Sequence, residues 1–535
     1  MKQFLHTLGL LALLLGMATT AQAAPAYPGK IKKTMADGRT VEVYLRGDEH
    51  VHYYEDDRGL ILQEGAAGCL SYAADQQAAR RQIEQQWQTV QQARRKVAPA
   101  TITRKFPTTG VVKGLVILAE YEDVKFSTPD AHATFDAMAN QAHYDGPHAS
   151  GSVYDYFVAQ SGGRFTPQFE VVGPLTLPHN RRYYGENEKA PEMIEDACKA
   201  AKAQGTDFTQ FDVNNDGTVD FVFVIFAGYG ESQGGPMECI WPKMLDMTYE
   251  TWTTFDGLYL GVAACTCELH GNEGAVTDGV GTFCHEFSHI LGLPDVYDTS
   301  TASMTMAMGM MAWDIMDKGL YNDDTRTPAG YTAMDRYTVG WLTPTVLDQP
   351  ALGVALTPLG TSNEACFIVN PDDPNEYYTI ENRQLVGWDS ALPGHGLIVT
   401  HVHYVPQIWA ANHVNRLGNG AYEHVELIAA DGLKTEATYG SDPFPGTGEA
   451  TAFSPREWHT GEAVGRPLTG IREAEDGTVY FDFRADEAAA VQQPAGHLAN
   501  PRACESAYDL QGRKLPGSLT APGLRIINRN IYIIK

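Results

Sequence analysis

Apolar and polar positions alternate in the first hundred residues and then change period. Residues 40–45 and 50–54 alternate between apolar and polar side chains and are bounded by Gly-containing turns, which predicts β-hairpins. Ile83, Trp87 and Val90 then recur at helical spacing in a stretch rich in Gln, Arg and Ala. This second pattern predicts an amphipathic helix.

The middle of the chain contains continuous apolar runs. Residues 115–118 are apolar on successive positions, and so are residues 220–226 after Asp220, which predicts strands buried on both faces. Residues 153–159 predict a helix. Mixed strands and helices favour an α/β (α+β) core over residues 106–344.

After this core, short strand-like runs alternate with Gly, Pro and Asp turns. Residues 345–485 are therefore expected to form a β-rich, sandwich-like domain. Residues 486–505 have the Ala, Gln and Pro composition of a linker. Residues 506–535 predict a small C-terminal hairpin module.

The N-terminal residues 24–105 are expected to form a separate α+β unit, because 535 residues are too many for one hydrophobic core. The unit ends in the basic run Arg94-Arg95-Lys96, which would suit proteolytic processing. A removable propeptide and a permanent N-terminal domain both remain open.

Residues 1–23 have the pattern of a signal peptide. Lys2 precedes the apolar run 8–16, which is too short to span a bilayer comfortably, and Ala21-Gln22-Ala23 has the small-x-small pattern of a signal peptidase site. We expect cleavage after Ala23 and a secreted or cell-surface protein; the alternative is an uncleaved anchor. No later stretch predicts a transmembrane helix.

Net charge and cysteine content limit the classes of protein to which this chain can belong. With 39 Lys and Arg against 66 Asp and Glu, the net charge of −27 disfavours nucleic-acid binding and suits a protein that binds divalent cations. The eight cysteines are sparse and irregularly spaced, which does not predict a disulfide framework.

A metal-binding motif lies at residues 285–289. On a helix, His285 and His289 lie on one face about one turn apart and can share one ion. Glu286 can then reach a water molecule at the metal and act as the general base. The alternative, two histidines on a helix surface, is weakened by the residues that follow.

Those residues predict a sharp turn and a third ligand. Gly292 permits a positive φ and Pro294 prevents the helix from continuing. Asp295 follows His289 by six positions, where the metzincin signature HExxHxxGxxH places its third ligand. Asp298 is the competing candidate. No Glu occurs between Glu286 and Glu364, which disfavours the class whose third ligand is a downstream Glu.

A methionine-rich segment follows at residues 310–319. Metzincins carry a tight turn whose methionine forms an apolar floor below the metal, and Met316 fits this position. A Met-rich core segment is the alternative. Tyr321 is a candidate hydroxyl donor to the reaction oxyanion.

A second metal site is expected before the apolar run 220–226. Oxygen-bearing side chains occupy positions 1, 3, 5, 7 and 9 of a loop with Gly at position 6, which is the spacing of a calcium loop. Position 12 is Phe223 instead of Glu, so the loop is truncated. An Asx-rich turn without calcium is the alternative. The candidate ligands are Asp212, Asn214, Asp216, Thr218 and Asp220.

These motifs resemble a known family. Residues 281–295, Ala312-Trp313-Asp314-Ile315-Met316-Asp317 and Glu381-Asn382-Arg383-Gln384 are similar to segments of the M6 (immune inhibitor A-like) metalloproteases. The resemblance covers roughly residues 112–483. It implies a metzincin-like catalytic domain, a structural calcium ion and secretion. The family carries Asp where typical metzincins carry His.

The tail resembles the C-terminal module of proteins from the Bacteroidetes phylum, where it is read as a surface or secretion signal. A sorting or cell-surface attachment role and an ordinary hairpin both remain open.

We therefore expect a secreted zinc-dependent endopeptidase that acts on proteins or peptides, with His285, His289 and Asp295 on zinc and Glu286 as base. The alternative from another class is a noncatalytic surface adhesin on a metalloprotease scaffold, which would not need Glu286. An exopeptidase is a third reading, but no motif for anchoring a substrate terminus is evident.

Overall fold

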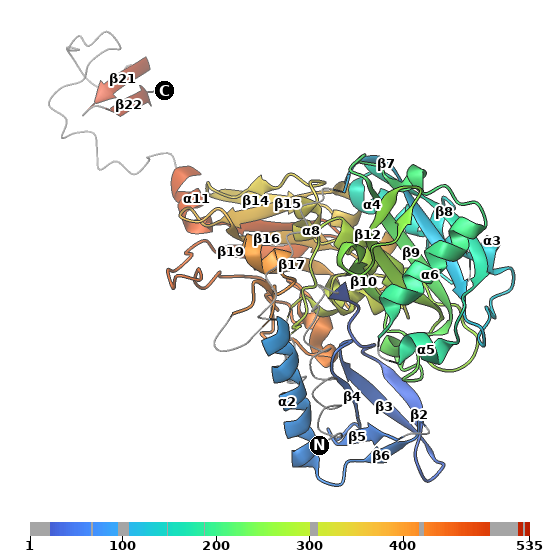
Figure 1. Ribbon diagram of the computed structural model, residues 1–535. Helices are drawn as coiled ribbons and strands as arrows, with labels where there is room; N and C mark the ends of the chain where they lie inside the picture. The colour runs from blue at the N-terminus through green and yellow to red at the C-terminus, as the bar shows by residue number, and fades with distance from the viewer. Residues whose placement is uncertain are drawn as a thin grey trace.

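The computed structural model describes residues 22–65, 68–94, 106–146, 148–186, 188–299, 309–416, 422–492, 523–527 and 530–534 (Figure 1). The expected signal peptide up to residue 21 and the basic linker after Arg94 lie outside the described residues. No described helix is long and apolar enough to cross a membrane.

The centre of the molecule is a seven-stranded sheet of order β1-β10-β12-β9-β7-β8, with β11 paired to β12. Strands β12, β9, β7 and β8 run parallel, whereas β10 is antiparallel to β12 and β1 is antiparallel to β10. The bounds are β1 Gln22–Ala23, β7 Gly110–Glu120, β8 Phe165–Thr176, β9 Thr218–Tyr229, β10 Lys243–Asp246, β11 Thr254–Phe255 and β12 Leu258–Leu269.

Helices cover both faces of this sheet, which explains the continuous apolar runs in the sequence. Val116 and Phe223 pack into a core with helix α7 (Gly281–Ile290), whereas Leu115 and Val222 pack into a second core with helix α6 (Ala190–Ala203). The expectation of a mixed α/β core is confirmed. The other helices here are α3 Ala131–Asn140, α4 Val153–Ser161, α5 Arg181–Gly185 and α8 Ala333–Thr338.

The β-rich region forms two facing sheets, of order β13-β15-β16-β17-β18 and β14-β20-β19. Ile380 and Val399 face the smaller sheet, as a sandwich requires. The bounds are β13 Thr345–Val346, β14 Ala351–Leu356, α9 Leu359–Ser362, β15 Ala365–Val369, β16 Glu376–Arg383, β17 Gly396–His403, α10 Pro406–Ala410, β18 Val425–Leu427, β19 Leu468–Glu473 and β20 Val479–Phe483.

The opposite face of the larger sheet packs on the α/β region. Phe367, Ile398 and Val402 belong to the same hydrophobic core as Phe287 of α7. Strands β16 and β17 are therefore buried along their whole length. The change of sequence pattern near residue 345 does not interrupt the core.

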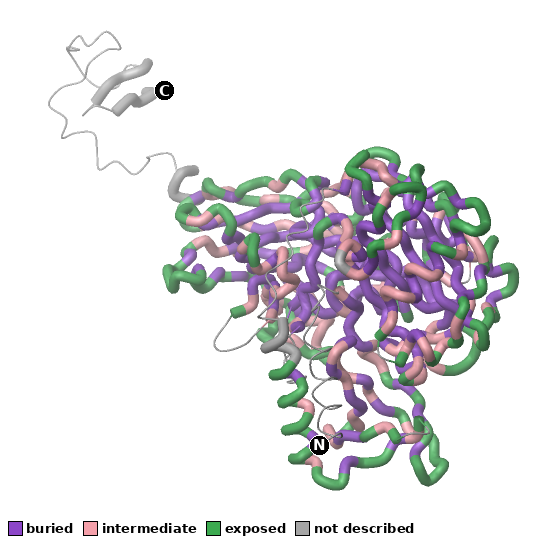
Figure 2. Tube along the Cα trace, viewed as in Figure 1, coloured by how far each residue is buried: buried purple, intermediate pink, exposed green. Residues whose placement is uncertain are grey.

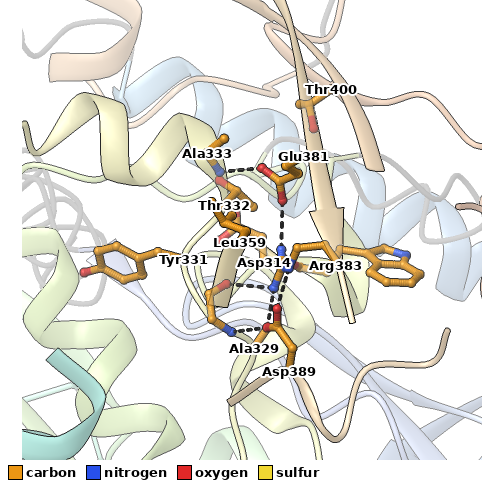
Figure 3. Close-up of polar contacts among 12 residues, drawn as sticks. Asp314, Ala329, Tyr331, Thr332, Ala333, Leu359, Glu381, Arg383, Asp389 and Thr400 are labelled. Atoms are coloured by element: carbon orange, nitrogen blue, oxygen red, sulfur yellow. Dashed lines mark hydrogen bonds and ion pairs between the residues drawn. The ribbon is translucent and has the colours of Figure 1, made fainter. Parts of the chain in front are cut away.

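A buried ion cluster strengthens this junction (Figure 3). The Arg383 guanidinium is fully buried and contacts Glu381 at 3.0 Å and Asp389 at 2.6 Å. It also donates to the carbonyl oxygens of Trp313 and Gly330 at 3.0 Å each. The β-rich region is thereby joined to the segment that contains the predicted Met-turn.

The N-terminal unit is a five-stranded sheet with helix α2 (Gln76–Arg94) beside it (Figure 1). Its core is small and includes one residue of the α/β region, Trp241. The strands are β2 Lys30–Thr34, β3 Thr40–Gly47, β4 His52–Glu55, β5 Ile61–Glu64 and β6 Leu70–Tyr72, in chain order. The predicted hairpins and helix are confirmed.

At the C-terminus, the start of the expected linker is helical, because its alanines favour helix α11 (Ala485–Gln492). Strands β21 (Gly523–Ile527) and β22 (Asn530–Ile534) pair as the predicted hairpin, drawn apart from the other regions in Figure 1.

Candidate active site

Helix α7 carries the two predicted histidines and the predicted base in a fully buried position. His285 and Glu286 are 0% exposed and His289 is 4% exposed. The helix ends at Ile290, and Gly292 follows with φ of 100° as the sequence predicted. The positive φ turns the chain back, so that Asp295 reaches the histidines.

The spacing of three side-chain atoms fits one tetrahedral metal ion. Asp295 Oδ1 lies 3.4 Å from His285 Nε2 and 3.4 Å from His289 Nε2. In a tetrahedral zinc site with bonds of about 2.1 Å, ligand atoms lie about 3.4 Å apart. These contacts involve Asp295 and not the competing candidate Asp298.

Unsatisfied polar atoms also converge here. His285 Nε2, His289 Nε2, Asp295 Oδ1 and Glu286 Oε2 are buried and have no hydrogen-bond partner among the described residues. Burial of such atoms without a partner is costly, so this set of nitrogen and oxygen donors fits a bound cation.

Hydrogen bonds from surrounding groups orient all three ligand candidates. His285 Nδ1 contacts the carbonyl oxygen of Ile315 at 2.7 Å, and His289 Nδ1 contacts that of Leu293 at 2.8 Å. Each Nδ1 therefore donates, and each Nε2 presents its lone pair to the site.

Asn412 orients the carboxylate. Its side-chain Nδ2 donates to Asp295 Oδ2 at 2.5 Å, and its Oδ1 accepts from the Asp295 backbone N–H at 2.7 Å. Asn412 follows helix α10 in the β-rich region. Sequence reasoning missed it, because 117 residues separate the partners and no motif joins them.

Two carboxylates lie beside the histidine pair, and they differ in environment. The candidate ligand atoms of His285, Glu286 and His289 lie within 4.8 Å of one another, so Glu286 is also near enough to be a ligand. Glu286 Oε1, however, accepts from the backbone N–H of Ala24 at 3.1 Å, whereas Asp295 contacts both imidazoles.

Burial and neighbouring charge separate the pKa values of these groups. Burial raises the pKa of Glu286 well above its usual range, and the charge of Asp295 adds to this effect. Burial also acts to raise the pKa of Asp295, but the His289 and His285 imidazoles outweigh it and hold this pKa well below normal. Burial lowers the pKa of His285. The region thus favours a neutral His285 imidazole beside an ionised Asp295.

The segment of the predicted Met-turn contacts the histidine helix through the Ile315 carbonyl. Met316 is fully buried in the shared core, and its carbonyl oxygen accepts from the backbone N–H of Val296 at 3.0 Å. Its neighbour Ile315 supplies the carbonyl that holds His285. Tyr321, the candidate oxyanion donor, instead donates to the carbonyl oxygen of Pro25 at 2.6 Å.

A cavity of about 590 Å³ adjoins His289. Its lining includes Gln22 from β1 together with apolar side chains from several parts of the chain. Among these side chains are Phe106, Met244, Val262, Leu293 and Trp409.

The predicted calcium ligands lie in the loop before β9. Asp212 Oδ1 and Oδ2 accept from the backbone N–H groups of Asp216 and Gly217, and Asp216 Oδ1 accepts from that of Thr218. Asn214 Nδ2 donates to Asp220 Oδ1 at 2.7 Å. Burial, with the nearby Asp216 and Asp212 charges, raises the pKa of Asp220 to about 6. The five side chains therefore form one connected loop, compatible with a calcium loop or an Asx-rich turn.

Comparison with known proteins finds similarity over the residues that form this site. Residues 115–342 match the model of the immune inhibitor A peptidase M6 catalytic domain. Immune inhibitor A of Bacillus thuringiensis subsp. alesti is 30% identical over 258 residues, which are 39% of this chain and 36% of that protein. The pre-pro-metalloprotease PrtV of Vibrio cholerae is 24% identical over 216 residues, 34% of this chain and 23% of PrtV.

The chain thus matches only 36% and 23% of the lengths of these relatives. The matched residues nevertheless contain helix α7, Asp295 and Met316, which form the centre described above. Residues 115–342 are therefore similar to the catalytic domain of the immune inhibitor A (M6) peptidases.

Proposed function

We propose that the protein is a secreted zinc-dependent endopeptidase, with His285, His289 and Asp295 holding the metal and Glu286 as general base. The observation that carries this proposal is the pair of 3.4 Å separations between Asp295 Oδ1 and the two Nε2 atoms. The match to a peptidase family model and the relative named as a pre-pro-metalloprotease support the reaction class, and protein or peptide substrates follow from it.

When bound, zinc would supply a Lewis acid that polarises the scissile carbonyl and lowers the pKa of water. Glu286 accepts the proton of the attacking water and transfers it to the leaving amine. The buried environment excludes other water and strengthens these charge interactions.

The arrangement favours a catalyst over a noncatalytic adhesin. An adhesin on this scaffold could keep a structural metal, but it would not need a buried, partly unsatisfied carboxylate beside the ligand set. Among the described residues, Glu286 Oε2 has no hydrogen-bond partner, which lowers stability. A noncatalytic adhesin would gain nothing from this loss of stability.

The test is casein hydrolysis, after limited trypsin treatment has removed the N-terminal unit, by the zinc-loaded wild type, by Glu286→Ala and by the exposed control Glu364→Ala. We expect Glu286→Ala to lose activity by at least about 10³-fold while it still binds zinc, and Glu364→Ala to match the wild type. o-Phenanthroline should abolish activity, and added zinc should restore it. Equal activity of Glu286→Ala and wild type would refute the assigned base.

We infer that residues 24–105 act as an inhibitory pro-region. Ala24 donates its N–H to the proposed base and is 0% exposed, so a substrate cannot reach Glu286 while this segment is in place. Cys69, the alternative blocking residue, lies in the hairpin between β5 and β6, where its carbonyl accepts from Gly65. The contact at Ala24 therefore favours the removable propeptide over the permanent domain.

Calcium at the loop 212–220 and a sorting role for the C-terminal hairpin complete the proposal. Calcium is supported by the oxygen spacing of the loop. The nearby Asp216 and Asp212 carboxylates add to burial in raising the pKa of Asp220. A calcium-selective chelator should lower the Tm of the wild type, with less effect on Asp216→Ala. An unchanged Tm, with calcium absent from metal analysis, would favour the Asx-rich turn.

A further inference from the structure

Strand β1 and the next residue lie in the catalytic cleft as an extended peptide. Gln22 pairs with Met244 and Ala23 with Lys243 in antiparallel register along the edge strand β10. Ala23 is 1% and Ala24 0% exposed. This segment therefore stands in for the backbone of a bound substrate.

One peptide bond of this segment is held at both of its polar atoms. The N–H of Ala24 donates to Glu286 Oε1 at 3.1 Å. The carbonyl oxygen of the same peptide group, which belongs to Ala23, accepts from the hydroxyl of Tyr297. Tyr297 is 9% exposed and lies two residues after Asp295.

Hydrolysis needs a different group at each of these atoms. As the water oxygen bonds to the carbonyl carbon, the carbonyl oxygen gains negative charge and needs a donor. The C–N bond then breaks, and the amine nitrogen needs a proton, which the base received from the water. Glu286 faces the nitrogen and Tyr297 faces the oxygen, as these two requirements demand.

We propose that Tyr297 is a catalytic residue that donates a hydrogen bond to the carbonyl oxygen of the scissile peptide bond, whose position Ala23–Ala24 occupies here. This proposal rests on the proposed peptidase function. The water proton passes through Glu286 to the leaving amine, and Tyr297 keeps its own proton throughout. We also expect the signal peptidase to cut at Ala23–Ala24, so this pair marks the positions of a substrate and not its preferred sequence.

Two other side chains bind backbone beyond this bond. Trp241 Nε1 donates to the carbonyl oxygen of Ala24 at 2.8 Å, and the Tyr321 hydroxyl donates to that of Pro25 at 2.6 Å. These carbonyls do not react. Tyr321 is therefore a substrate-binding residue, and it provides a matched comparison for the loss of one hydroxyl.

Both experiments use the zinc-loaded chain after limited trypsin treatment has removed the N-terminal unit. The first compares steady-state casein hydrolysis by wild type, Tyr297→Phe and Tyr321→Phe. Tyr297→Phe should lower kcat by about 10²-fold with KM changed less than about threefold, because an oxyanion contact forms fully only in the transition state. Tyr321→Phe should mainly raise KM. Tyr184→Phe, whose hydroxyl bonds Asp196, is the unaffected control.

The second experiment measures binding instead of turnover. A phosphinic peptide with the sequence of residues 22–25 carries a tetrahedral anionic group at the scissile position, whereas the reduced-amide peptide has no oxygen there. Tyr297→Phe should weaken the phosphinic peptide about 10²-fold in calorimetry and leave the reduced-amide peptide within about threefold.

The outcomes separate the two proposals. If Glu286-dependent hydrolysis occurs but Tyr297→Phe keeps more than half of the wild-type kcat, the role of Tyr297 is overturned and the peptidase function stands. If the wild type hydrolyses nothing, the proposed peptidase function fails. The role of Tyr297 is then decided by the ratio of the phosphinic-peptide affinities of wild type and Tyr297→Phe. Equal phosphinic-peptide affinity in wild type and Tyr297→Phe would then overturn the carbonyl contact.

Discussion

The N-terminal unit and the β-rich region both contact the catalytic region, but through opposite kinds of interface. The β-rich region shares a continuous apolar core with it and adds the buried Arg383 cluster. The N-terminal unit has a smaller core that includes only Trp241 among the described residues of the catalytic region, and its other contacts include exposed polar pairs such as Lys32–Glu273. Figure 2 shows this difference as denser burial in the upper regions than in the N-terminal sheet.

The two interfaces also affect the active site in opposite ways. The β-rich region supports the metal site, because Asn412 holds Asp295. The N-terminal unit obstructs it, because Ala24 bonds to Glu286. In the proposed function, the β-rich region completes the site and remains with the enzyme, whereas the N-terminal unit blocks the site and moves away. The apolar interface of the first and the polar contacts of the second agree with these roles.

The largest effect is expected at the buried ion cluster. Arg383→Met should lower the free energy of unfolding by about 3–5 kcal/mol, because Glu381 and Asp389 remain buried without their cation. Urea unfolding measures this change. Arg182→Ala, which removes the partner of an exposed pair, should cost less than about 1 kcal/mol. Similar losses in the two variants would mean that the β-rich interface is not held by this cluster.

The support of the metal site should have the next largest effect. Asn412→Ala should weaken zinc binding about 10- to 100-fold, because Asp295 loses the partner that orients it. Competition with a zinc indicator dye measures this affinity. Asn375→Ala, in an exposed turn, is the control. Unchanged zinc affinity in Asn412→Ala would show that the β-rich region contributes stability alone.

Separation of the N-terminal unit should leave the remaining body folded. Limited trypsin treatment should cut at the basic run 94–96, release the N-terminal fragment and raise casein hydrolysis by at least about tenfold. The near-UV circular dichroism of the remaining body should be retained, since the shared core stays intact. Loss of both activity and fold after this cut would indicate a permanent domain.

The smallest effect concerns pH at the β-rich interface. Burial raises the pKa of Asp442 to about 7, although its hydrogen bond from Trp313 Nε1 opposes this rise. The folded state therefore holds a proton that the unfolded state has lost, and stability falls as pH rises from about 4 to 7.

Asp442→Asn removes this titration. The Tm of Asp442→Asn relative to wild type should therefore increase by a few degrees between pH 5 and 8, as scanning calorimetry can measure. Asp37→Asn, at an exposed carboxylate beside Arg39, should show no such increase. A constant difference across this pH range would exclude Asp442 as the titrating group.

Much of the fold could be predicted from local pattern. The runs at 115–118 and 220–226 lie in β7 and β9, and the helical spacing at Ile83 and Trp87 lies in α2. It could not be predicted that the α/β region and the β-rich region share one hydrophobic core. A run such as residues 396–402 shows that a strand is buried on both faces, but it does not identify what covers each face.

The sequence alone determined the helix with His285, Glu286 and His289, the turn at Gly292 and the candidate ligand Asp295, because these features depend on spacing within a short segment. The tertiary structure decided which groups complete the site. Asn412 comes from the β-rich region, and Ala24 from the N-terminal segment. The role inferred for Tyr297 likewise required the structure, because a hydroxyl near the motif is informative only when the atom that it contacts is known.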